Sequence, residues 1–95
     1  MKLVRITFRF EFWDAVEAIL DENEITDFTR VDCAGRDRDG KHYGSKVFPG
    51  RMMLVEALVE DDATPDLLAG LRAFRESKKA QEHMRAAVIE VGEQL

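Results

Sequence analysis

The chain opens with a strand-like alternation of apolar and polar side chains. Between residues 2 and 10 the apolar positions recur at every second residue and share one side of an extended chain: Val4, Ile6, Phe8 and Phe10. The spacing then lengthens to that of a helix, with one apolar stripe made by Phe12, Val16, Ile19 and Leu20. Trp13 is expected to pack at the start of this helix, and Asn23 and Glu24 to end it.

Two further segments have the character of strands. The first runs from about residue 25 to 34, and its imperfect alternation is compatible with a bulge. The second, RMMLVEALVE at residues 51–60, is apolar on both faces apart from Glu56. One face carries Met53, Val55, Ala57 and Val59, and the other carries Met52, Leu54 and Leu58. Because an antiparallel sheet in a monomer normally has one polar face, we expect another copy of the chain to cover the second face.

A second helix is predicted from Thr64-Pro65-Asp66, which combines a capping hydroxyl, proline at the first helical position and an acidic residue. Its buried stripe is Leu67, Leu68, Leu71 and Phe74. Gly70 is expected to allow close packing on the sheet, and the charged side chains that follow, Arg72, Arg75 and Glu76, are interpreted as facing solvent. A short last strand is expected to contain Ala87, Ile89 and Val91.

This order of elements predicts an α+β fold. It is that of a ferredoxin-like βαββαβ sandwich, with a four-stranded antiparallel sheet, two helices on one face and a long loop between strands two and three. The 95 residues are expected to form a single domain, with a flexible loop at about residues 36–49. Since many unrelated activities share this fold, the function must come from particular residues.

The long loop is the most distinctive part of the chain. From residue 35 to 50 it reads GRDRDGKHYGSKVFPG, with four basic side chains against two acidic ones in a chain of net charge −5. Arg36, Arg38 and Lys41 stand beside Gly35, Gly40 and Gly44, which let backbone N–H groups approach an anion closely, so the loop is a candidate anion site. The alternative is a solvated loop in which Asp37 and Asp39 neutralise the arginines.

Composition and charge exclude several classes of function. The acidic balance argues against general nucleic-acid binding, and no apolar run approaches the roughly 18–20 residues that would span a bilayer. A single cysteine and the lack of a signal sequence suggest the cytoplasm. No nucleophile–base pair stands out, so we expect no enzyme. Cys33, His42 and His83 are weak metal-ligand candidates at no recognisable spacing, and no metal site is predicted.

Three segments resemble the PII-like proteins, the signalling family related to the nitrogen regulatory protein PII. They are the opening MKLVRITFRFEFWDAVEAILDENEITDFTRVDCAGRD, the VFPG step at residues 47–50 and the ending AAVIEV. The resemblance implies a homotrimer whose bare sheet faces pack together, ligand clefts between subunits, and a loop (the T-loop) that contacts partner proteins. It also implies that the nucleotide phosphates are contacted by Gly35, Arg36 and Arg38 and, after the second helix, by Ser77, Lys78 and Lys79.

The chain departs from this family in ways that indicate a short, divergent member. The segment after the second helix, ESKKAQEH, has no glycine, whereas nucleotide-binding members carry a glycine-rich turn there. The combined hypothesis is a non-enzymatic, trimeric sensor. It would bind a small anion, with adenine nucleotide or bicarbonate as candidates and no required cofactor, and would signal through its loop to a membrane transporter or an enzyme. The alternatives are a metal-binding accessory protein associated with metal efflux, and a ferredoxin-like effector domain that binds a small molecule as a dimer.

Overall fold

The computed structural model describes residues 1–36, 42–43, 51–78 and 84–95. The first half of the chain forms β1 (Lys2–Arg9), the 3-10 turn η1 (Phe10–Phe12), α1 (Trp13–Glu22), β2 (Phe28–Cys33) and two short strands, β3 (Gly35–Arg36) and β4 (His42–Tyr43). The second half forms β5 (Met52–Val59), the 3-10 turn η2 (Asp61–Ala63), α2 (Thr64–Ser77) and β6 (Met84–Glu90). The predicted βαββαβ order is confirmed.

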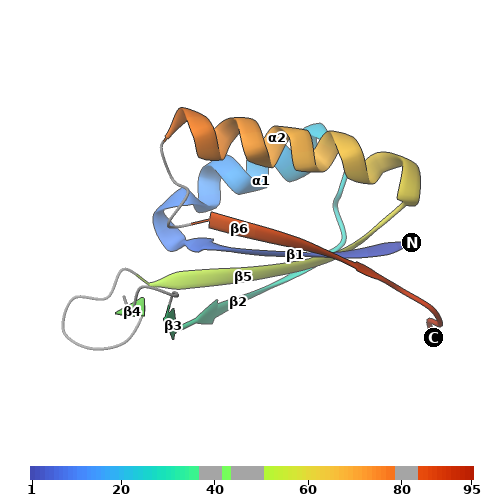
Figure 1. Cartoon of the computed structure of the whole chain (residues 1–95), viewed down its shortest axis with the longest axis horizontal. Helices are drawn as coiled ribbons and strands as arrows, with labels where there is room; N and C mark the ends of the chain where they lie inside the picture. Colours follow the sequence, from blue (N-terminus) through green and yellow to red (C-terminus); the bar gives the residue numbers. More distant parts are fainter. Residues whose placement is uncertain (37–41, 44–50, 79–83) are drawn as a thin grey trace.

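The four long strands form one antiparallel sheet in the order β2-β5-β1-β6. Both helices lie on one face of this sheet, and both chain ends lie at the end opposite to the β3–β4 hairpin (Figure 1). This is the ferredoxin-like α+β sandwich that the sequence predicts. The β3–β4 pair is an addition that the periodicity did not indicate, and it falls within the predicted loop.

The core lies between the sheet and the two helices. Its fully buried members come from alternate positions of the central strands and from the helix stripes: Phe8, Ile6, Leu20, Leu67, Val4, Val16 and Val55. The inward-facing residues that alternation predicted for β1 and β5 are therefore confirmed, apart from Phe10. Trp13 packs as expected, with its ring 6.4 Å from that of Phe8 in a stacked arrangement and 5.8 Å from that of Phe28 edge-on.

Three boundaries differ from those predicted. Phe10 is not in the strand but in η1, and its side chain is 40% exposed. The second strand begins at Phe28 rather than near residue 25, because the Ile25 N–H donates to the Leu20 carbonyl at 2.9 Å and completes the helix end. The last strand ends at Glu90, so Val91 lies outside it. The register of β2 with β5 is continuous, so the bulge that the imperfect alternation allowed is absent from these pairs.

Gly70 does allow a close approach, but to the other helix rather than to the sheet. A Cβ atom at Gly70 would lie 3.1 Å from Cγ2 of Ile19 on α1. That distance is tighter than ordinary van der Waals contact, so the absence of a side chain lets α1 and α2 pack closely.

Phe8 and Phe10 share one side of the alternating pattern, yet only Phe8 is buried, and this difference gives a matched test of the core. We expect Phe8→Ala to lower the free energy of unfolding by about 3–5 kcal/mol, because it removes a large ring from a packed interior. Phe10→Ala should cost less than about 1 kcal/mol. Urea denaturation followed by circular dichroism measures both values. Equal losses in the two variants would contradict the assigned core.

Candidate functional site

The predicted anion loop begins at a short hairpin beside the end of the main sheet. Gly35 pairs with Tyr43 and Arg36 with His42, directly after β2. A Cβ atom at Gly35 would lie 3.6 Å from Sδ of Met52, an ordinary contact, so the close approach of Gly35 to β5 does not itself require a glycine. The structure thus holds the base of the loop against the first residue of β5.

The remaining predicted ligand residues are placed only in part. Lys78 is exposed and caps the end of α2, where its N–H donates to the Phe74 carbonyl at 3.1 Å. Arg38, Lys41 and Lys79 lie outside the described residues, as does the metal candidate His83. The backbones of Arg36 and His42 are described but their side chains are not, so the ligand set remains a prediction.

Arg51 immediately precedes β5, and the alternation of apolar residues did not indicate the contacts that it makes. Its guanidinium carbon lies 4.6 Å from the centre of the Phe10 ring, and its carbonyl accepts a hydrogen bond from the Phe10 N–H at 2.8 Å. Nη1 of Arg51 lies 3.9 Å from Oδ2 of Asp32. These contacts join η1, β2 and β5 at the end of the sheet from which the loop emerges.

Neither helix covers the opposite face of the sheet, and just over half of the side chains on that face are apolar. Register and alternation assign to it the apolar residues Leu3, Val31, Cys33, Met52, Leu54, Leu58, Ala87 and Ile89. Val31, Leu58 and Ile89 are 44%, 45% and 40% exposed, whereas Met52 is 8% exposed and lies against Gly35. Exposed apolar side chains grouped on one face are a feature of interaction surfaces.

An ion pair lies near the middle of this face, which also carries the polar side chains of Thr7, Thr29 and Arg85. Nε and Nη2 of Arg5 donate to Oε2 of Glu56 at 2.9 and 2.7 Å across neighbouring strands. Two donors on one carboxylate oxygen make a well-satisfied pair, which costs less to bury than either charge alone. The pair is therefore compatible with a covered face.

Cys33 lies at the edge of this face and is partly buried. Burial, and secondarily the negative charge of Asp32, raises the pKa of its thiol. A raised pKa disfavours the thiolate, which is the form that binds metals. Within the described part of the chain, no three or more His, Cys, Asp or Glu side chains are grouped so as to hold a metal ion.

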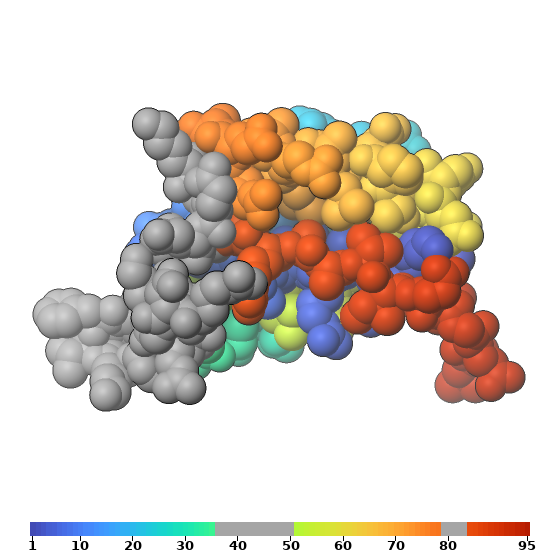
Figure 2. All heavy atoms as spheres, viewed as in Figure 1, coloured from blue at the N-terminus to red at the C-terminus, as the bar shows by residue number. Residues whose placement is uncertain are grey.

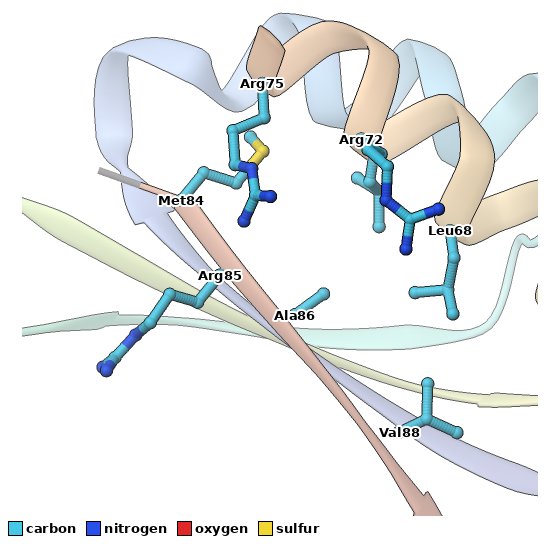
Figure 3. Close-up of a pocket in the computed structure, with 8 residues that line it drawn as sticks. Leu68, Arg72, Arg75, Met84, Arg85, Ala86 and Val88 are labelled. Atoms are coloured by element: carbon cyan, nitrogen blue, oxygen red, sulfur yellow. The ribbon is translucent and has the colours of Figure 1, made fainter. Parts of the chain in front are cut away.

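A hollow of about 140 Å³ lies on the other side of the sheet, between α2 and β6. Arg72 and Arg75 reach into it from α2, over Met84 and Ala86 of β6 (Figure 3). Arg72 and Glu76 are exposed as predicted, whereas Arg75 is only partly exposed. The sequence alone did not indicate this partial burial, because the hollow forms only where α2 packs beside β6.

The chain is similar to known proteins at the level of three-dimensional structure. No family model matches the chain, and no curated protein matches it significantly. CPII, a nitrogen regulatory PII-like protein from Thiomonas intermedia K12 bound to ADP, AMP and bicarbonate, is 20% identical over 99% of this chain and 94% of its own, with a TM-score of 0.68.

Two further solved structures extend this likeness. The apo form of CPII is 19% identical over 98% of this chain and 92% of its own, with a TM-score of 0.69. A DUF3240 family protein from Shewanella baltica OS155 is 14% identical over 98% and 91%, with a TM-score of 0.75. The resemblance to PII-like proteins is thus confirmed in the fold. The two described helices, α1 and α2, are not long and apolar enough to cross a membrane.

The thiol of Cys33 offers a test of the environment at the end of β2. Because burial and Asp32 raise its pKa, the pH–rate profile of alkylation by iodoacetamide should have a higher midpoint in the folded protein than in urea. Asp32→Asn removes the negative charge, which is the smaller of the two causes of the raised pKa. It should lower the midpoint of the alkylation profile part of the way toward that of the unfolded chain. Asp62→Asn, in η2, serves as the control and should leave it unchanged. A folded midpoint at or below that of the unfolded chain would refute the assigned environment.

Proposed function

We propose that the chain is a cytoplasmic, non-enzymatic PII-like regulator that works as a homotrimer. The observation that carries the proposal is the end-to-end likeness in fold to CPII, a regulatory protein seen with ADP, AMP and bicarbonate. The resemblance of the opening, loop and closing segments points to the same class. In this proposal the 95 residues act as one domain, and their ligand is a small anion such as an adenine nucleotide or bicarbonate.

The uncovered sheet face supports the assembly. Its exposed leucine, valine and isoleucine side chains would be removed from water by a second and a third copy of the same surface. The Arg5–Glu56 pair would be carried into the interface already neutralised. Clefts would then form where neighbouring subunits meet, and the loop base lies at one end of the same sheet (Figure 1).

The anion would be bound by the loop and by the residues that follow α2. In the proposal, Arg36, Arg38 and Lys41 supply charge, Gly35 begins the loop, and Lys78 with Lys79 approaches from the end of α2. Guanidinium groups bind phosphate or carboxylate through paired hydrogen bonds, which suits the ligands of CPII. Ligand binding would then change the conformation of the loop at residues 36–49 and hence its contact with a transporter or enzyme.

The assembly is tested by placing a charge on the uncovered face. Leu58 is exposed on the isolated protomer, so Leu58→Glu should leave the protomer folded but bury an unpaired carboxylate in the trimer. We expect the variant to sediment as a monomer at concentrations where the parent protein is a trimer. Analytical ultracentrifugation measures the masses, and circular dichroism checks the fold.

The matched control for this test is Ala18→Glu, which adds the same charge at an exposed position on α1. It should leave the trimer intact. A parent protein that stays monomeric at micromolar concentration would overturn the proposed assembly. A parent dimer would instead favour the effector-domain alternative.

The anion site is tested by calorimetric titration with ADP, AMP and bicarbonate. We expect Arg36→Ala combined with Arg38→Ala to weaken binding of the preferred ligand by at least about tenfold, because each change removes a charge-assisted contact. Lys2→Ala is the control. It removes a positive charge at the opposite end of the sheet, where Lys2 pairs with Glu90, and should leave the affinity unchanged. Equal affinities in the parent and the double variant would rule out the loop as the site.

A further inference from the structure

The hollow between α2 and β6 combines an apolar floor with guanidinium groups at its rim. Its apolar walls come from both elements: Leu68, Leu71, Met84, Ala86 and Val88. Figure 2 shows β6 running alongside α2 at the edge of the sheet, where no further strand follows. Val88 remains 40% exposed although it lies on the helix side of β6, opposite Val4 in the register. The packing of α2 on the sheet therefore leaves apolar surface open at this edge.

The guanidinium groups that extend over the hollow come from α2. Arg72 and Arg75 are three residues apart on α2, hence on the same face of the helix, and both side chains extend toward β6 (Figure 3). Among the residues that the structure describes, no carboxylate lies within 4 Å of either guanidinium group, and the buried Nε of Arg75 has no hydrogen-bond partner. A buried N–H group is normally paired, so the described residues leave this rim without an acceptor.

Arg85 provides a useful contrast. It also borders the hollow, but its side chain extends from β6 away from Arg72 and Arg75 (Figure 3). The register explains this direction, because Arg85 lies opposite Thr7 and so belongs to the helix-free face. The two α2 arginines therefore form the rim of the hollow, and the third arginine does not contribute.

The size and chemistry of the hollow define its occupant. Its volume of about 140 Å³ is close to the ~150 Å³ of an engineered apolar cavity that binds benzene, and the hollow is open to solvent on one side. We propose that the hollow binds a small apolar carboxylate, whose body of about six carbon atoms packs on Leu68, Met84 and Val88. Its carboxylate accepts hydrogen bonds from the guanidinium groups of Arg72 and Arg75. This site lies within one protomer, on the helix side of the sheet, and goes beyond the proposed anion site at the loop.

The experiment titrates the protein with benzoate and follows the methyl groups of Leu68, Met84, Ala86 and Val88 by NMR. We expect saturable shifts confined to these methyl groups. Arg75→Gln should weaken benzoate binding by at least about tenfold, since it removes a charged donor from a partly desolvated contact. Arg85→Gln removes the same charge from the other face of β6 and should change the affinity by less than about twofold.

Two more measurements test whether benzoate is recognised by both its ring and its charge, and whether it binds in the hollow. Benzyl alcohol, which has the ring without the charge, and inorganic phosphate, which has the charge without the ring, should each bind at least about tenfold more weakly than benzoate. Ala86→Leu fills the hollow and should abolish the benzoate shifts while the thermal unfolding temperature is maintained. Equal binding of either partial ligand would overturn the proposal. So would benzoate shifts confined to the loop base or the helix-free face, or equal losses in Arg75→Gln and Arg85→Gln.

Discussion

The structure depends on β5, a strand that carries apolar side chains on both of its faces. It pairs with β1 on one side and β2 on the other, so its hydrogen bonds hold together the two halves of the chain. Its inner side chains Val55 and Ala57 lie in the core beneath the helices. On its outer face Met52 is buried beside Gly35, whereas Leu58 is 45% exposed. The inner face is therefore packed within one protomer, and the proposed trimer would remove the exposed part of the outer face from water.

Packing against the helices explains how the remaining elements are placed. Phe8 and Trp13 stack where β1 turns into α1, and Gly70 lets α2 approach Ile19 closely. Drawing α2 against α1 has a consequence at the opposite edge of the sheet. There β6 has no further neighbour among the described strands, and a hollow lined by Leu68, Arg72 and Val88 separates it from α2.

Most of the fold could be predicted because two periods, two residues in strands and 3.6 in helices, report burial directly. The element boundaries predicted from periodicity were wrong where the backbone leaves a strand or helix for a turn. Phe10 continues the alternation on paper, but the chain has already entered a 3-10 turn, and Ile25 is buried by the helix end rather than by a strand. Periodicity also cannot show which way a polar side chain leans once the helix is packed. Arg75 therefore looked like a surface residue, and the contacts of Arg51 with Phe10 and Asp32 were missed.

The candidate binding regions also show why net charge is a poor guide to the ligand of this chain. The protein carries −5 overall, and its 19 acidic residues are spread along the chain, with only four of them on α1. Arg72 and Arg75 nevertheless lie together at the hollow between α2 and β6. At physiological ionic strength charges are screened over about 8 Å, so a small anion responds to the groups beside it rather than to the whole molecule. A long polyanion would instead also meet the acidic side chains that are spread over the rest of the chain. A local pair of arginines in an acidic protein therefore suits a small anion better than nucleic acid, although arginine attracts both.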